Sequence, residues 1–389
     1  MDVSKICSDL VKIKSENPPG ITKGVAEYIY NFMESVGVPS ELIECPNGHT
    51  NVISKDQSKK LLLAGHIDVV PAIDEGWDIP PFSGKIDETF VHGRGSTDMK
   101  GGCSSILAAV EKIAGSGEEL PSLAFVCDEE GGGKYGMRHL LDKKLIHQCD
   151  CLIAEPTPAK APCIGQKGVC RFDVEFNGEP GHSSLYPVLG ISAVTQAMDF
   201  IHCVDKIHER VYNVPEIDRI IENSIDVSNE LYGADLTPVF KHIMYNPGII
   251  SGGERVNIVA QKCSLSMDMR LPWGADCDNI INEIRGVLPK SAKLNVLTEA
   301  NASITTPDSF LVKTTCDAVG RVYKIESKPM VQWAASDARA LRIAGFNAIE
   351  YGPGELDCMH GLNERVRRTQ LENCVEIYEN VIRSYNGAE

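Results

Sequence analysis

Histidine and acidic residues end several apolar runs of this sequence, in a pattern that could hold metal ions. The run LLLAGHIDVV contains His66 and Asp68, and side chains two residues apart on a strand point to the same face. A carboxylate beside an imidazole fixes the tautomer of the ring and raises its basicity, as it commonly does for a metal-binding histidine. The pair predicts a metal ligand with an orienting aspartate. The alternative is a satisfied core histidine followed by a helix-capping aspartate.

Two further motifs place acids where cations could compensate them. Asp98 lies in HGRGSTDMKGG, just before a segment with helical spacing. A helix N-terminus stabilises an anion, and a carboxylate there could bridge two cations, with an ordinary helix cap as the alternative. Glu129 and Glu130 lie in CDEEGGG after an apolar run, and burying adjacent carboxylates is costly without cations. One of them could bind a metal while its neighbour acts as general base, unless the segment is a solvated acidic loop.

Two more residues complete the candidate set. Glu155 ends another apolar run in IAEPT, and His360 lies in a glycine-flanked loop in DCMHGLNE. Each motif alone is a weak signal, but together they place imidazole and carboxylate groups at successive strand ends and loops of one domain. Mixed nitrogen and oxygen ligands of these kinds suit zinc, cobalt or manganese rather than calcium or a thiolate site.

The elements that must position these residues alternate between strand and helix. The predicted buried strands are 61–70, 122–130 and 149–155, and the predicted helices are 1–14, 22–36, 100–115 and 135–144. The strands are continuous apolar runs and the helices have apolar residues at helical spacing. This alternation is typical of an α/β layer with a parallel or mixed sheet, in which sites lie at the carboxyl ends of the strands.

The pattern changes after Gly165 and returns near residue 301. Strands that alternate between apolar and polar residues are expected at 169–179, 257–271 and 292–299, with helices at 190–206 and 277–288 and helical decoration over 207–245. The later part predicts helices at 308–322, 335–344 and 368–385 and a strand at 347–352. We therefore expect a catalytic domain built from residues 1–165 and 301–389, with a small α+β domain, 166–300, inserted between them.

Bulk composition narrows the class of protein. The 389 residues exceed the roughly 250–300 at which one core stops growing, which favours two domains. A net charge of −16 argues against nucleic acid and anionic membranes as partners. We expect no membrane span and no signal peptide, because no apolar run is long enough and the N-terminus lacks the required pattern. The 14 cysteines are scattered without a C-x-x-C pair, so reduced thiols and a cytoplasmic location are expected.

Taken in order, these motifs resemble the acetylornithine deacetylase / succinyl-diaminopimelate desuccinylase family. The resemblance covers essentially the whole chain and is carried by GHIDVVP, GRGSTDMKGG, DEEGG, AEPT, GHSS, RVNIVA, SDAR and MHGLNE. It implies a zinc-exopeptidase-like catalytic domain, in which helices flank a mixed sheet, and an inserted ferredoxin-like α+β lid that carries the dimer interface. Aminoacylases, glutamate-releasing carboxypeptidases and metal dipeptidases are wider relatives.

The resemblance also implies a role for each candidate residue. His66 and Glu155 would hold one zinc, Glu130 and His360 would hold the other, Asp98 would bridge both, Asp68 would orient His66, and Glu129 would be the general base. Cobalt or manganese could replace zinc.

In the lid, the resemblance implies that His182 of GEPGHSS reaches the active site of the partner subunit in a homodimer and helps to hold the carbonyl oxygen. Four residues are candidates for binding the substrate's carboxylates: Asn257, Arg270, Ser336 and Arg339. A surface histidine and surface arginines are the alternatives.

The reaction implied is metal-dependent hydrolysis of the amide bond of an N-acyl amino acid. Glu155, in place of aspartate, is more typical of deacylases, and GRGSTDMKGG and SDAR are most similar to the succinyl-diaminopimelate desuccinylases. Two departures concern the substrate: WAASDAR replaces a Gly/Thr-rich segment, and 207–245 is extra. Deacetylation of acetylornithine or of an acetyl-lysine-type substrate, and a dipeptidase or carboxypeptidase activity, stay open as alternatives. A non-catalytic binding protein is disfavoured because every ligand and base position is filled.

Overall fold

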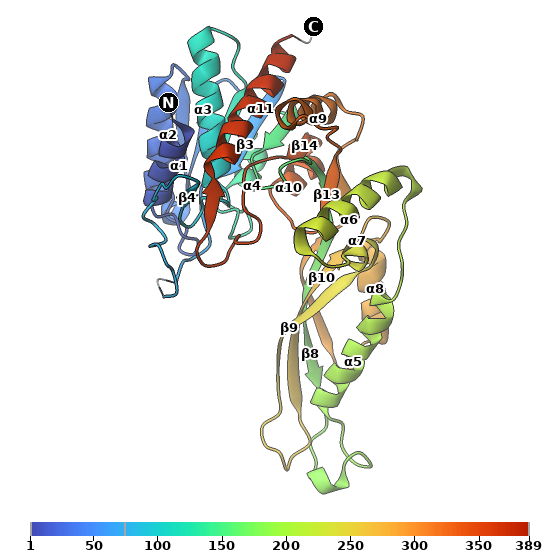
Figure 1. Cartoon of the computed structure of the whole chain (residues 1–389). Coiled ribbons are helices and arrows are strands. Elements are labelled where there is room, and N and C mark those ends of the chain that lie inside the picture. The colour runs from blue at the N-terminus through green and yellow to red at the C-terminus, as the bar shows by residue number, and fades with distance from the viewer. Residues whose placement is uncertain (1, 74, 388–389) are drawn as a thin grey trace. The chain divides into compact units, whose positions relative to one another are not determined.

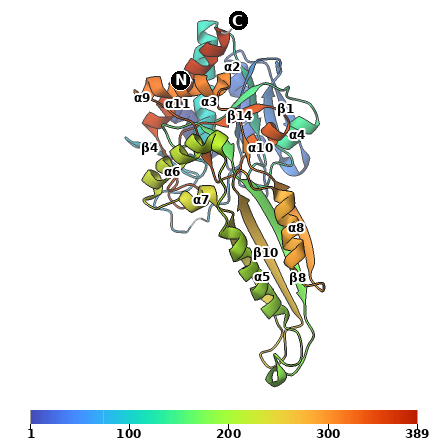
Figure 2. The ribbon, with the colours of Figure 1, turned by 90° about the vertical axis from the view of Figure 1, so that its right-hand side faces the viewer.

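The computed structural model describes residues 2–73 and 75–387 (Figures 1 and 2). The chain divides into two compact units. The first comprises residues up to Ile164, Ile304–Met330 and the chain from Ala335, and the second comprises Gly165–Ser303 with Val331–Ala334. The expected insertion, 166–300, falls within the second unit, but the return of Val331–Ala334 to that unit was not expected.

A mixed sheet forms the centre of the first unit. Over the described residues its nine strands are, in spatial order, β1 (Ser40–Glu44), β2 (Thr50–Ser54), β5 (Ser122–Val126), β3 (Leu61–His66), β6 (Asp150–Ile153), β14 (Asn347–Glu350), β7 (Cys163–Gln166) and β12 (Ser303–Ile304), with β13 (Met330–Gln332) pairing with β7. The four strands β5, β3, β6 and β14 run parallel, and the pairings β1–β2, β2–β5 and β14–β7 are antiparallel. The carboxyl ends of the four parallel strands therefore share one edge.

Helices cover this sheet. They are α1 (Val3–Lys12), α2 (Lys23–Ser35), α3 (Lys100–Ser116), α4 (Met137–Asp142), α9 (Phe310–Tyr323), α10 (Ala338–Ile343) and α11 (Arg368–Asn386), with a short turn η1 (Pro46–Gly48). Helix α3 packs against both α1 and α11, and α11 also packs against α9 (Figure 1). A two-stranded ladder pairs β4 (Phe90–His92) with β15 (Arg365–Arg367). The expected α/β fold, a mixed sheet flanked by helices, is confirmed.

The parallel strands form where the sequence has continuous apolar runs, because both faces are covered. Every residue of β3 and of β5 is buried. The strands are nevertheless shorter than predicted: β3 ends at His66 and β5 at Val126, so the acids that follow them lie in turns. The antiparallel hairpin β1–β2 was missed by the prediction.

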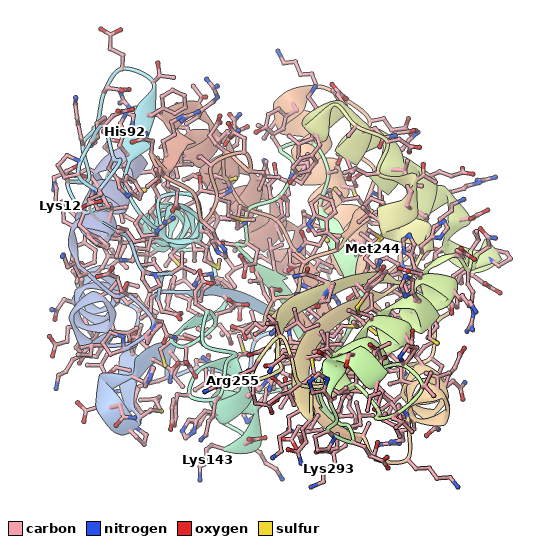
Figure 3. The ribbon with its side chains drawn as sticks, turned by 90° about the horizontal axis from the view of Figure 1, so that it is seen from below. Lys12, His92, Lys143, Met244, Arg255 and Lys293 are labelled. Carbon is pink, nitrogen blue, oxygen red and sulfur yellow. The ribbon has the colours of Figure 1, made fainter. Side chains whose placement is uncertain are left out.

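The second unit contains a four-stranded antiparallel sheet. Its strands are, in spatial order, β11 (Lys293–Ala300), β8 (Gly168–Asn177), β10 (Lys262–Leu271) and β9 (Met244–Gly252). Helices α5 (Ala193–His208) and α8 (Cys277–Val287) run along it (Figure 2), and the inward side chains of β8 and β10 form a core with them. Figure 3 marks Met244 and Lys293 at the starts of the two edge strands. The predicted strand 257–271 begins only at Lys262, and β9 was not predicted.

The stretch 207–245, expected to be helical decoration, contains η3 (Pro215–Ile217), α6 (Asp218–Tyr232) and α7 (Thr237–Lys241), and a further turn η2 (Ser183–Leu185) precedes α5. Segment Val331–Ala334 packs here: the backbone N–H of Val331 donates to Ser224 Oγ at 2.9 Å. The Trp333 ring packs edge-on against the rings of Tyr232 and Phe240. The two departures noted in the sequence, 207–245 and the tryptophan of WAASDAR, therefore form one packed cluster.

Two further observations concern the chain as a whole. All fourteen cysteines lie among the described residues as free thiols, and most of them are buried. No helix in the described ranges is long and apolar enough to cross a membrane.

Candidate metal centre

Six of the seven predicted metal-centre residues follow strands that share one edge of the sheet. His66 ends β3 and Asp68 follows it, Glu129 and Glu130 lie in the turn after β5, and Glu155 lies just beyond β6; His360 lies in the loop after β14. The seventh, Asp98, precedes α3 by two residues. Because the parallel strands end together, residues far apart in sequence arrive at one place.

His66 and Asp98 form the buried centre of the cluster. His66 is 2% exposed and Asp98 is 8% exposed. His66 Nε2 lies 2.9 Å from Asp98 Oδ1 and 3.8 Å from Glu155 Oε1. One imidazole and two carboxylates therefore surround a point at which a cation could bind.

His360 completes a second group around the same aspartate. Its Nε2 lies 3.1 Å from Asp98 Oδ2 and 3.3 Å from Glu130 Oε1. Asp98 thus contacts one histidine with each of its carboxylate oxygens, which is the arrangement that a bridging ligand requires. His66, Asp98 and Glu130 also offer ligand atoms that all lie within 4.8 Å of one another.

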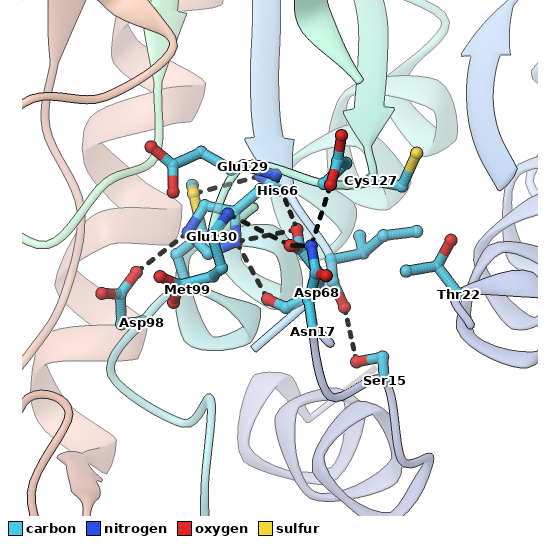
Figure 4. Close-up of polar contacts among 12 residues, drawn as sticks. Ser15, Asn17, Thr22, His66, Asp68, Asp98, Met99, Cys127, Glu129 and Glu130 are labelled. Carbon is cyan, nitrogen blue, oxygen red and sulfur yellow. Dashed lines mark hydrogen bonds and ion pairs between the residues drawn. The ribbon is translucent and has the colours of Figure 1, made fainter. Parts of the chain in front are cut away.

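Asp68 organises the turn beside this cluster (Figure 4). Its backbone oxygen lies 2.9 Å from His66 Nδ1, while its carboxylate Oδ1 is 3.6 Å away. The carboxylate accepts hydrogen bonds from the backbone N–H groups of Glu129 and Glu130, both at 3.1 Å, and from the side-chain amide of Asn17 at 2.9 Å. Asp68 therefore orients His66 mainly through its carbonyl and fixes the acidic turn through its side chain.

The charges of the cluster call for additional positive charge. Burial lowers the pKa of His66, but Glu155, Asp68 and Asp98 raise it well above its ordinary value. Hydrogen bonds to Asp98 and Glu130 raise the pKa of His360 to about 10. Both rings thus act as the counter-charges of the carboxylates, a role that divalent cations would take over with release of protons.

The donor set fits divalent cations. The two groups offer only imidazole nitrogen and carboxylate oxygen, the ligands that zinc and its first-row neighbours accept in hydrolase sites. Glu130 Oε1 is buried, and its neighbour in the cluster is the ring of His360, whose Nε2 lies 3.3 Å away. A buried carboxylate oxygen that faces an imidazole nitrogen of the same cluster is placed as a metal ligand would be.

Glu129 precedes Glu130 in the turn after β5, and its pKa is shifted in a way that suits proton transfer. Burial raises its pKa well above the ordinary value, His66 opposes this, and Asp337 and Glu130 add to the rise. Asp337 itself is buried, and that burial raises its pKa to about 7. A carboxyl group of raised basicity beside a cation site is suited to accept and return protons.

Ser336 and Arg339, predicted as substrate-binding residues, lie at the start of α10. The Ser336 hydroxyl donates to the carboxylate of buried Glu350 and accepts from the backbone N–H of Ala338 at 3.1 Å. Arg339 is 9% exposed. Ser336 therefore anchors the turn that precedes α10, whatever contact it makes with a substrate.

The other predicted residues belong to the second unit, and each is described within it. His182 is exposed, and its Nδ1 accepts from the backbone N–H of Ser184 at 3.3 Å. Asn257 is exposed in the loop before β10. Arg270, on β10, forms an ion pair with Asp268, with Nε 2.7 Å from Oδ1.

Sequence reasoning missed Asn17 and Asp128. The Asn17 amide donates to the carboxylates of both Asp68 and Asp128, so it joins the turns after β3 and β5. The only signal for Asn17 was its place in the turn-forming segment ENPPG, which says nothing about a distant partner. Asp128 lay within the acidic motif CDEEGGG already quoted.

The amino-acid sequence matches a model of a protein family. The model described as peptidase family M20/M25/M40 matches residues 62–384. The chain belongs to this family. Metal-dependent amide hydrolysis, predicted from the sequence, is confirmed as the activity class of this M20 protein.

Curated relatives of this M20 protein carry one recurrent name. The succinyl-diaminopimelate desuccinylase of Helicobacter hepaticus is 31% identical over 318 residues, which cover 78% of this chain and 74% of the relative. The enzyme of the same name from Aliarcobacter butzleri is 26% identical and covers 99% of this chain and 100% of its own.

Solved structures share the fold. A metallo-carboxypeptidase of the M20 family from Sulfolobus solfataricus superimposes with a TM-score of 0.81 at 18% identity, covering 100% of both chains. A dinuclear metal-binding M20 peptidase of Bacillus subtilis gives a TM-score of 0.66 at 12% identity, over 98% of this chain and 96% of that one. At these identities the likeness concerns the fold.

Proposed function

We propose that this protein hydrolyses the amide bond of an N-acyl amino acid with two divalent cations held by the cluster around Asp98. The observation that carries the proposal is the position of Asp98, whose two carboxylate oxygens face His66 and His360 respectively at 2.9 and 3.1 Å. A single counter-charge is enough for an isolated buried carboxylate. A carboxylate that faces two separate groups, each with an imidazole and a second carboxylate, is suited to bridge two cations.

The ligands divide between two positions. His66 and Glu155 belong to one, Glu130 and His360 to the other, and Asp98 to both. We propose zinc as the metal, with cobalt or manganese as substitutes, because the set contains nitrogen and oxygen donors and no thiolate.

The catalytic roles follow from the chemistry of each side chain. Bound cations supply Lewis acidity, which acidifies a water molecule and polarises the amide carbonyl. Glu129 accepts the proton of the attacking water and delivers it to the leaving amine, a task that its raised pKa favours. Asp68 keeps His66 oriented and holds the peptide groups of the Glu129–Glu130 turn.

His182 is proposed to stabilise the oxyanion in the partner subunit of a homodimer. Because its Nδ1 accepts a hydrogen bond from Ser184, the proton of the neutral ring is on Nε2, which can donate to a developing negative charge. The second unit also offers an exposed edge strand, β9, on which Ile249 is 67% and Ile250 is 50% exposed. An exposed apolar edge strand of this kind favours pairing with a second copy.

We propose N-succinyl-diaminopimelate as the substrate, hydrolysed in the biosynthesis of diaminopimelate and lysine in the cytoplasm. The names of the relatives in Helicobacter hepaticus and Aliarcobacter butzleri support this choice. The carboxylates of such a substrate suit arginine, so Arg270 and Arg339 are candidates for binding them, and Asn257 and Ser336 are further candidates. A peptidase is the second candidate, because the superimposable Sulfolobus solfataricus protein is a carboxypeptidase.

Turnover of three substrates tests the proposal. The protein is loaded with zinc or cobalt and supplied with N-succinyl-diaminopimelate, N-acetylornithine or a dipeptide ending in glutamate, and the released amine is quantified. The expected result is the highest kcat/KM for N-succinyl-diaminopimelate. Turnover of the dipeptide alone would refute the deacylase, and no turnover of any of the three would refute catalysis at this centre.

A further inference from the structure

A buried ion pair joins two segments that carry candidate metal ligands. Arg94 and Glu364 are separated by 270 positions, yet Arg94 Nη1 lies 2.5 Å from Glu364 Oε2. Their side chains are 4% and 0% exposed, respectively. The pair lies beside the ladder of β4 and β15, in which His92 pairs with Arg365.

Each side chain of the pair also forms hydrogen bonds with the backbone of the segment that contains the other. Glu364 Oε1 accepts from the backbone N–H of Thr97 at 2.9 Å and from that of Asp98 at 3.1 Å. Arg94 Nη2 donates to the backbone oxygens of Gly361 at 3.1 Å and His360 at 3.4 Å. One ion pair thus holds the peptide groups of both Asp98 and His360.

Support at the backbone matters for His360 because its side chain is half-exposed. Its side chain is 48% exposed, and its backbone has φ +60°, a left-handed conformation that few non-glycine residues adopt. Its Nε2 nevertheless lies 3.1 Å from Asp98 Oδ2, although the two residues come from loops that are far apart in the sequence. A shift of either loop would increase the distance between the Asp98 carboxylate and the His360 ring.

We propose that Arg94 and Glu364 are positioning residues that set the spacing between Asp98 and His360, and thereby the affinity of the cation position that includes His360. The proposal rests on the ligand roles assigned under the proposed function. Outer groups that hold ligands typically change metal affinity about 10–100-fold when they are removed. The position that includes His66 and Glu155 depends on the pair only through Asp98, so its affinity should change less.

A buried ion pair is weak evidence for stability, because apolar residues of similar volume often replace it without loss. This gives a way to separate positioning from folding. The double variant Arg94→Met/Glu364→Leu removes both charges at once and leaves no unpaired buried charge. It should unfold within a few degrees of the wild type, but the peptide groups of His360 and Asp98 lose their shared anchor.

Cobalt titration of the metal-free protein tests the proposal. Uptake is followed by visible absorption and by competition with a chelator, independently of activity, in the wild type and the double variant. We expect two equivalents in the wild type; in the double variant one equivalent binds nearly as tightly and the other about 10–100-fold more weakly. The kcat of the double variant should be higher with saturating cobalt than with zinc at trace concentration, because the weakened position is then filled. The KM of the double variant should stay close to that of the wild type.

Tyr378→Phe serves as the matched control. It removes a buried hydrogen bond, from Tyr378 Oη to Tyr351 O at 2.7 Å, without touching a candidate ligand. It should leave both cobalt affinities unchanged. If the double variant does not fold, Glu364→Gln, which keeps the side-chain shape and loses the charge, should weaken one equivalent in the same direction.

Two outcomes would overturn the proposal in distinguishable ways. A folded double variant, or a folded Glu364→Gln variant, that binds both equivalents with wild-type affinity would reduce the pair to a structural role. A wild type that binds only one equivalent would refute the two-cation centre itself, and with it the role of the pair, before any variant is compared.

Discussion

The two units hold their chemistry-bearing side chains in different ways. In the first, His66, Asp98 and Glu155 are buried, and their polar atoms face one another at the carboxyl ends of parallel strands. In the second, His182 is exposed and Arg270 is paired with its neighbour Asp268. The first unit therefore gathers the groups that we propose for cation binding and proton transfer, whereas the residues that we propose in the second unit are single side chains outside such a cluster.

This difference predicts which variants should change metal binding and which should change only catalysis. A cluster that is built from backbone hydrogen bonds and strand ends can be tested through metal binding in the isolated protein. An exposed histidine on a short turn has no such internal readout, so its role must be measured in catalysis. Three variants sharpen this contrast, in order of decreasing effect.

Glu129→Gln should have the largest effect. The amide cannot accept a proton, so kcat should fall by about 10²–10⁴-fold, the usual contribution of a general base. Both cations should still bind, because the ligands are unchanged, and metal analysis of the purified variant checks this. Glu130→Gln is the matched control in the neighbouring position and should lose one equivalent of metal. A Glu129→Gln variant with normal kcat would remove Glu129 from the mechanism.

The strand ends of the first unit could be predicted because local signals suffice there. Continuous apolar runs specify buried strands, and parallel strands must end at one edge, so the acids after β5 and β6 and the histidine of β3 were placed together. The exact strand ends were less predictable, since the acids of the β5 motif lie in a turn that the Asp68 carboxylate stabilises from another segment.

Contacts between distant loops could not be predicted. The side-chain amide of Asn17 reaches Asp68 and Asp128, and Arg94 reaches Glu364, only because the fold brings these loops together. No local pattern encodes such a pairing. Edge strand β9 was missed for a related reason: it is mostly exposed and lacks the apolar alternation that marks a half-buried strand.

His182→Gln should have the intermediate effect. We expect kcat to fall by about 10²-fold, the scale for loss of one oxyanion donor, while the cobalt affinities stay unchanged. If His182 acts in the partner's site, mixing this variant with Glu129→Gln should restore activity, because one mixed site then has both groups. Mixing Glu129→Gln with Glu130→Gln should restore none. Absence of recovery in dimers shown to have exchanged subunits would argue for action within one chain.

Lys167→Met should have the smallest effect, and it acts on stability rather than catalysis. Lys167 is fully buried in the second unit, where its Nζ donates to the backbone oxygens of Val239 at 2.6 Å and His242 at 2.8 Å. Burial, with Arg270 adding to it, lowers the pKa of this lysine to about 7. In the unfolded chain a lysine titrates near 10.4, so between these values the unfolded state binds more protons than the folded state.

The free energy of unfolding of the wild type, relative to Lys167→Met, should therefore rise between pH 7 and pH 10, by up to about 1.4 kcal/mol per pH unit. Below pH 7 both states are protonated and the difference should level off. Urea unfolding followed by tryptophan fluorescence measures it in a Trp77→Phe background, in which the remaining Trp273 and Trp333 both belong to the second unit. Lys262→Met, which changes an exposed lysine on β10 of the same unit, is the control. A relative stability that is flat across this range would mean that the two carbonyls keep Lys167 charged in the folded unit, and the second unit would then hold a buried charge as firmly as the first.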